Sequence, residues 1–129
     1  MKVAIAGSRN ATSYHLISDA VDDSGFEITE VITGDSQGID TLAQDWADEH
    51  DIDVRIFVAD HKKWGADAMI KRNRQMLAYA DALIVIWDGE HRNTKYLIDA
   101  AKKKKIKMFV YNFKSFHNPN PKDVGYTDE

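Results

Sequence analysis

Residues 82–87 read Ala-Leu-Ile-Val-Ile-Trp and form the most apolar stretch of the chain. Six apolar residues in succession are typical of a strand that is buried on both faces, as strands in a parallel sheet are. The stretch ends at Asp88-Gly89, a pair of residues that favours a turn. The sequence therefore predicts a buried central strand over residues 82–87, followed by a loop.

Four further strand-like stretches alternate with helical patterns. They cover residues 3–6, 30–33, 54–58 and 106–111. Strands that alternate with helices form a parallel sheet with helices on both faces, and right-handed crossovers leave few arrangements of the strands. We predict one three-layer α/β/α domain over residues 1–111, with a five-stranded parallel sheet in the order 3-2-1-4-5. A polar C-terminal tail, expected at the surface, follows over residues 112–129.

The composition excludes several classes of function. The 129 residues include no cysteine, which rules out disulfides, thiolate metal sites and cysteine nucleophiles. The five histidines show no recurrent ligand spacing, so no metal site is predicted, and no cofactor is expected. The net charge of −4 argues against nucleic acid as a partner. No apolar run approaches the ~20 residues of a membrane span, so a cytoplasmic domain is expected.

The predicted strand order places a ligand site between the first and fourth strands. In open parallel sheets, ligands bind outside the carboxyl ends of the strands, at the point where the strand order reverses. Three loops follow strands at this edge, and they cover residues 7–10, 34–40 and 87–94. We expect these loops to meet and to form one pocket.

The first two of these loops are predicted to hold phosphate. Gly7 permits a sharp turn into a helix start, where free backbone N–H groups favour anions, and Ser8 and Arg9 add further donors. A plain turn with a solvated Arg9 is the alternative. The second loop also matches the G-x-S-x-G nucleophile elbow, but only one predicted strand precedes the strand that leads into it, so a hydrolase is rejected. Its expected ligand contacts are Gly34, Ser36, Gln37, Gly38 and Asp40.

The helix predicted over residues 66–80 carries an unusual polar residue. Asn73 interrupts an apolar line on this helix, where an unpaired buried amide costs about 1–3 kcal/mol. It either ties down a neighbouring loop or is presented to a ligand beside Arg72, and both roles are compatible. Just before the helix, Trp64 offers a flat surface on which a base could stack, although tryptophan is more often core.

The loop after the central strand completes the predicted pocket. Asp88, at the strand end, can accept hydrogen bonds from ribose hydroxyls; a loop acid without a ligand is the alternative. Asn93 or Thr94 can cap the next helix and face a phosphate. Trp87 is a second candidate for stacking on a base, and Gly89 lies in the same loop.

These short motifs, taken in order, resemble the YspA-like branch of the SLOG superfamily. The resemblance implies a Rossmann-like fold that binds nucleotides or nucleotide-derived ligands, commonly as homodimers or larger assemblies. Relatives in the superfamily include the cytokinin-activating "lonely guy" phosphoribohydrolases and the DNA-processing protein DprA. The motifs are Gly7-Ser8-Arg9, Gly34-x-x-x-Gly38-x-Asp40, Trp64-Gly65, Arg72-Asn73-x-x-Met76, Ala80-Asp81-x-Leu83-Ile84-x-x-Trp87-Asp88-Gly89, and Thr94.

One departure from the lonely-guy enzymes bears on catalysis. Those enzymes carry a glycine-rich turn that ends in Gly-Thr, then a glutamate one turn later that assists cleavage of an N-glycosidic bond. Here Asn93 replaces the glycine, and no carboxylate follows at the expected place. The resemblance therefore leans away from an enzyme, with Asp88 and Glu90 as the only weak candidates for a catalytic acid.

Three functions remain open at this point. The favoured one is a non-catalytic binder of a small phosphorylated nucleotide derivative, such as an ADP-ribose-like or cyclic signal. Small relatives of this type are familiar from bacteriophages, where such a binder would suit sequestration of a host signal. The second is a nucleotide N-glycosidase that uses Asp88 or Glu90. The third is a DprA-like nucleic-acid adaptor that uses Lys102–Lys105, although a solvated helix end is the expected role of these lysines.

Overall fold

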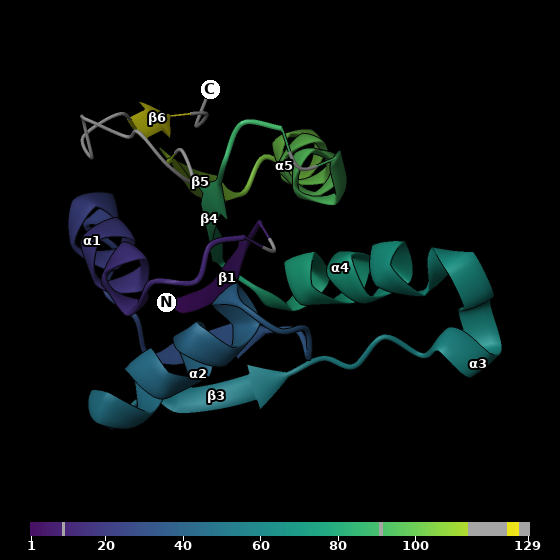
Figure 1. Ribbon diagram of the computed structural model, residues 1–129, viewed down its shortest axis with the longest axis horizontal. Helices are drawn as coiled ribbons and strands as arrows, with labels where there is room; N and C mark the ends of the chain where they lie inside the picture. The colour runs from purple at the N-terminus through teal and green to yellow at the C-terminus, as the bar shows by residue number, and fades with distance from the viewer. Residues whose placement is uncertain (9, 91, 114–123, 127–129) are drawn as a thin grey trace.

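The computed structural model describes residues 1–8, 10–90, 92–113 and 124–126 of the chain. Strands and helices alternate along it, as Figure 1 shows from the N-terminus to the C-terminus. None of the helices in these residues has both the length and the apolar character needed to cross a membrane. The elements are β1 (Lys2–Gly7), α1 (Tyr14–Ser24), β2 (Glu30–Thr33), α2 (Ile39–Glu49), β3 (Asp53–Ile56), α3 (His61–Trp64), the 3-10 turn η1 (Gly65–Asp67), α4 (Ala68–Tyr79), β4 (Ala82–Trp87), α5 (Arg92–Lys104), β5 (Lys107–Asn112) and β6 (Val124–Tyr126).

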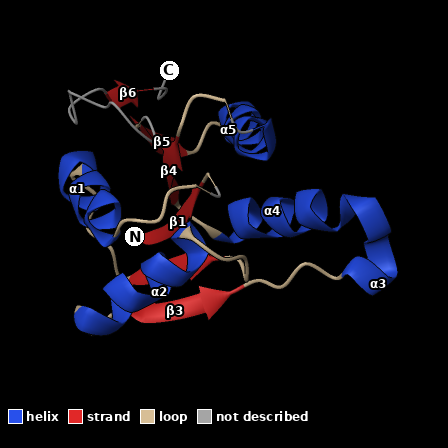
Figure 2. Cartoon of the chain, viewed as in Figure 1, coloured by secondary structure: helices blue, strands red, loops and turns tan. Residues whose placement is uncertain are grey.

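The sheet confirms the predicted strand order. Its strands run β3-β2-β1-β4-β5-β6, and the first five are parallel. The apolar stretch that defines β4 lies between β1 and β5, with Ala82 to Ile86 buried. Continuous burial follows because helices cover both faces of this strand (Figure 2).

Alternate residues of each strand pack against different pairs of helices. Ile84 and Ile86 of β4 lie in a cluster with side chains of α1 and α2. Leu83 and Val85 face the opposite side, in a second cluster with side chains of α4 and α5. The domain therefore has three layers, with one hydrophobic cluster on each face of the sheet.

The structure differs from the sequence-based expectation at three places. β3 ends at Ile56, short of the predicted end at residue 58, and Val58 is largely exposed. A short helix, α3, and a 3-10 turn precede α4, which begins at Ala68 and not at the predicted residue 66. Past residue 111, where no strand is predicted, β6 pairs antiparallel with β5, and Phe113 is buried. A three-residue strand carries too little periodicity to be visible in a polar sequence.

Candidate functional site

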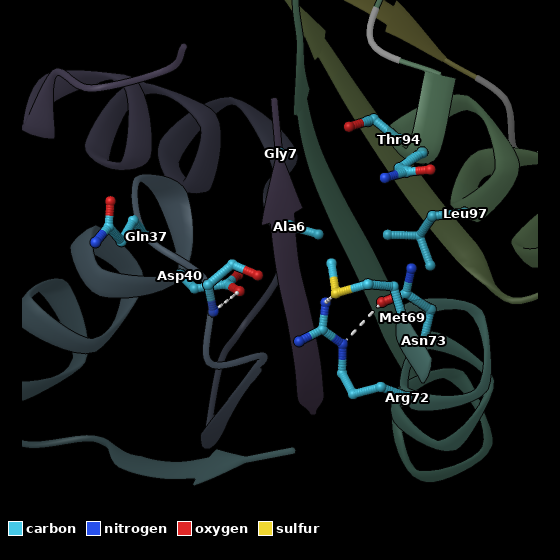
Figure 3. A pocket seen from close by; sticks show the side chains of 11 residues that line it. Ala6, Gly7, Gln37, Asp40, Met69, Arg72, Asn73, Thr94 and Leu97 are labelled. Carbon is cyan, nitrogen blue, oxygen red and sulfur yellow. Dashed lines mark hydrogen bonds between the residues drawn. The ribbon is translucent and has the colours of Figure 1, made fainter. Parts of the chain in front are cut away.

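A cavity opens at the carboxyl end of β1, where the strand order reverses. Its volume is about 60 Å³, which leaves room for a few water molecules or one compact anionic group. Figure 3 shows side chains from β1, the start of α2, α4 and the start of α5 around it. The lining residues are Ala6, Gly7, Ser36, Gln37, Asp40, Met69, Arg72, Asn73, Asn93, Thr94 and Leu97.

Close packing at Gly7 brings the start of α2 against the end of the sheet. A Cβ atom on this residue would lie 2.6 Å from the Ile86 carbonyl oxygen and 2.7 Å from Cγ1 of Ile39. Any larger side chain would force β4 or α2 away from β1. Because Gly7 has no side chain, β4 and the start of α2 can pack closely against the end of β1 beside the cavity.

Arg72 of α4 is a buried cation that joins α4 to the loop before α2. Its Nη1 donates a hydrogen bond to Asp35 Oδ1 at 3.0 Å, and its Nε donates to Asn73 Oδ1 at 3.0 Å. A Cβ on Gly34 would lie 2.5 Å from the Arg72 Cζ, so the guanidinium rests directly on the backbone of that loop. Because a buried charge needs a partner, this ion pair gives Arg72 a structural role besides the predicted contact with phosphate.

Asn73 is linked to the loop before α2 through Arg72, and it also lies in the cavity wall. Its side-chain oxygen accepts the Arg72 hydrogen bond, which accounts for a polar residue on this line of α4. The same side chain lines the cavity, where Figure 3 shows it beside Leu97. Its contact with a ligand stays a prediction.

Asp40 places a buried carboxyl group in the cavity wall. Its side chain is only 7% exposed, and Oδ2 accepts a hydrogen bond from the Ser36 backbone N–H at 3.0 Å. Burial raises the pKa of this carboxyl, while the Ser36 N–H, the Arg72 charge and hydrogen bonds at Thr33 and Gly34 act in the opposite direction. Such a group can accept hydrogen bonds from sugar hydroxyls, and a raised carboxyl pKa is also a property of general acids.

Two helix starts face the same cavity. Asp40 belongs to the first turn of α2, and Ser36 and Gln37 lie in the loop just before it. Asn93 and Thr94 belong to the start of α5. Helix N-termini carry a partial positive charge and favour anions. Together with Arg72, they offset the carboxylates of Asp35 and Asp40 around this space.

Ser8 and Asp88 link the ends of β1 and β4 to each other. Ser8 is fully buried; its Oγ accepts a hydrogen bond from the Asp88 backbone N–H at 3.1 Å, and its own N–H donates to the Ile86 carbonyl at 2.9 Å. The Asp88 carboxylate accepts the Glu90 N–H at 2.8 Å, which closes a turn in its own loop. These bonds hold the two strand ends in register beside the cavity.

The structure gathers part of the predicted set in the cavity wall. Gly7, Ser36, Gln37, Asp40, Arg72, Asn73, Asn93 and Thr94 line it. The described lining does not include Ser8, Gly34, Gly38, Trp64, Trp87, Asp88, Gly89 or Glu90, and Arg9 lies outside the described residues. Trp64 instead lies on α3, 41% exposed, with Lys63 and Lys71 over its ring. The binding roles assigned to these residues, and the catalytic role considered for Asp88 and Glu90, stay predictions.

Three apolar lining residues have no predicted part in the site. They are Ala6, Met69 and Leu97. The spacing of Met69 and Leu97 on their helices indicates an inward-facing position but cannot distinguish the core from the wall of a cavity. In the described residues, no group of three or more histidine, aspartate or glutamate side chains is arranged to hold a metal ion.

A parallel sheet in this order, with a polar cavity at the reversal of its strand order, defines a Rossmann-like domain of the kind that binds ligands at that edge. The sequence model of the YspA, cpYpsA-related SLOG family matches residues 1–64, from β1 through α3. This match confirms the resemblance to the YspA-like branch of the SLOG superfamily over residues 1–64. The match indicates nucleotide-related binding or processing. No curated protein matches the chain.

Proposed function

We propose that the chain binds a small phosphorylated nucleotide derivative, such as an ADP-ribose-like or cyclic signalling nucleotide, and does not turn it over. The observation that carries this proposal is the shared cavity. Four separate segments of the chain supply its wall at the edge of the sheet where ligands of such folds bind. A binder of this kind would act as a sensor or as a sponge that sequesters the signal.

The residues of the cavity wall suggest which of them contact the phosphate group of the ligand and which contact its ribose. The starts of α2 and α5, with the Gln37, Asn93 and Thr94 side chains, take a phosphate group. The buried Asp40 carboxyl takes ribose hydroxyls, a role that the sequence alone assigns to Asp88. Asn73 adds a polar side chain between the two.

The positions and hydrogen bonds of the carboxylates near the cavity support a protein that binds its ligand without cleaving it. Cleavage of an N-glycosidic bond requires a carboxylate beside the developing oxocarbenium ion. Among the described lining residues, Asp40 is the only acidic one, and its Oδ2 already accepts the Ser36 N–H. Asp88 accepts a bond from its own loop, and Glu90 is exposed.

A thermal-shift experiment tests the proposal with a matched pair of variants. AMP, ADP-ribose, NAD and cyclic dinucleotides are each added to the protein. At a ligand concentration 100-fold above Kd, binding stabilises the folded state by about 2.7 kcal/mol, which raises Tm by several degrees. Gln37→Ala, in the cavity wall, should reduce the shift, and Gln75→Ala, exposed on α4 outside the wall, should preserve it. If no nucleotide raises Tm of the unmodified protein, the proposal is wrong.

The raised pKa of Asp40 favours one alternative, a nucleotide N-glycosidase with this residue as the acid. It differs from the hypothesis drawn from the sequence, which places Asp88 or Glu90 in that role. Chromatography of the same nucleotides after incubation with the protein would detect a released base. Release that is abolished by Asp40→Asn but not by Asp88→Asn would establish this alternative.

A further inference from the structure

A second hollow, a groove between α4 and α5, continues from the cavity. Its volume is about 360 Å³, within the range of pockets that enclose small molecules. Met69, Asn73, Asn93 and Leu97 line both spaces, so the two adjoin along these side chains. A ligand held in the cavity can therefore extend into the groove.

The two spaces differ in chemistry. The cavity holds the Asp40 carboxyl and the Arg72 guanidinium, whereas the groove is lined mainly by apolar side chains such as Ile70, Tyr96 and Ala100. Arg74 is the charged residue in the described lining of the groove. Ile70 and Tyr96 are 40% and 51% exposed, which is high for large apolar side chains. A polar space that opens into an apolar one matches a ligand with a charged end and a flat, apolar end.

The aromatic side chain in the groove is a tyrosine. Tyr96 lies on α5, one turn before Ala100, and lines the groove. Trp64 and Trp87, the stacking residues expected from the sequence, line neither space. An exposed aromatic ring beside a cavity that suits phosphate and ribose is a surface on which a heterocyclic base can stack.

We propose that the groove is the subsite for the base of the bound nucleotide, with Tyr96 as its stacking residue and Ile70 as an apolar contact. Asn73 and Asn93, at the junction, then lie where the sugar joins the base. This inference rests on the proposed function and goes further, because it assigns discrimination between nucleotides and sugar phosphates to α4 and α5. The ligand class is a nucleotide whose base is required for tight binding.

Calorimetric titration with AMP and with ribose 5-phosphate, which lacks the base, tests the subsite. AMP should bind the unmodified protein more tightly than ribose 5-phosphate. Tyr96→Ala should weaken AMP binding about tenfold to a hundredfold and leave ribose 5-phosphate unchanged, since stacking on a base accounts for the difference. Tyr96→Phe, which keeps the ring, should retain AMP affinity within about threefold. Ile70→Ala provides a second variant in the same wall and should weaken AMP alone.

The outcomes separate this inference from the proposed function. If neither compound binds the unmodified protein while another nucleotide of the thermal-shift panel raises its Tm, the subsite as proposed is wrong and the proposed function stands. If no nucleotide of that panel binds, the proposed function fails, and the subsite fails with it. If both bind and Tyr96→Ala weakens them equally or not at all, the subsite is wrong while the proposed function stands. If light scattering shows that Tyr96→Ala converts an oligomer into a monomer and AMP affinity is unchanged, the groove is an interface between copies of the chain, which also overturns the inference.

Discussion

The two faces of the sheet are covered by helices in different ways. On one face, α1 and α2 bring Ile17, Ala43 and Trp46 onto the sheet in a continuous buried cluster. On the other face, α4 contributes Met76 and Leu77 from its last turns, while its first half holds the buried Arg72 and extends away from the sheet (Figure 1). The groove lies on this second face, and the cavity lies at the edge of the sheet, between the start of α2 and the two helices of the second face. The first face thus stabilises the domain, and the incompletely filled second face provides room for a ligand.

The largest difference between the faces should appear when a buried aliphatic side chain is truncated on each. Ile17→Ala on α1 leaves a closed void, so it should cost roughly 2–5 kcal/mol, in the upper half of that range. Leu97→Ala on α5 should cost less, because Leu97 already borders open space. Urea unfolding of both variants measures this difference. Equal losses would contradict the contrast between the faces.

A smaller loss of stability is expected from a substitution at Gly34. The Arg72 side chain of α4 packs against this glycine in the loop before α2, so helices of the two faces meet here. Gly34→Ala would place a Cβ 2.8 Å from Asp40 Oδ2 and closer still to the guanidinium, so it should displace the Arg72–Asp35 pair. We expect a loss of about 1–3 kcal/mol together with a lost nucleotide-induced shift in Tm. Gly25→Ala, at a left-handed position with open space around it, is the control: it should cost about 1 kcal/mol and keep that shift.

Asp40, at the start of α2, makes the stability of the domain depend on pH. Its pKa is raised, mainly by burial, above the ordinary value of 3.8, so the folded chain keeps this proton to higher pH than the unfolded chain does. The folded state then binds more protons, and the contribution of Asp40 to stability falls as pH rises from below 3.8 through its folded pKa. The free energy of unfolding of the unmodified protein, minus that of Asp40→Asn, should therefore decrease over this interval. Denaturant titrations at a series of pH values measure it; an increasing difference would show the opposite shift.

The smallest effect is expected at the end of α5, away from the cavity. Lys102, Lys103 and Lys104 are exposed in the last turn, where cations suit the helix dipole. Replacing all three with glutamine should lower the free energy of unfolding by less than about 1 kcal/mol and leave nucleotide affinity unchanged. Salt-dependent DNA binding that this triple variant loses would instead favour the adaptor hypothesis.

Much of the fold could be predicted because burial and local pattern agree. The unbroken apolar run of β4 and the regular spacing along α2 each indicate both the type of element and its buried side. β6 could not be predicted, because its pairing with β5 is a long-range contact and not a property of its three residues. The same reasoning places Gly7, Asp40 and Thr94 at one edge of the sheet, since the parallel strands that precede their loops end there together.

The amino-acid sequence by itself determined the layers, the strand order and the edge at which the strand-following loops meet, because these depend on periodicity and on the handedness of connections. Only the tertiary structure decided which side chains line the cavity. It paired Arg72 with Asp35, used Ser8 to tie β1 to β4, and placed Asp40 rather than Asp88 in the wall. Side-chain direction and partner choice depend on packing between distant segments, and a single sequence carries no local signal for either.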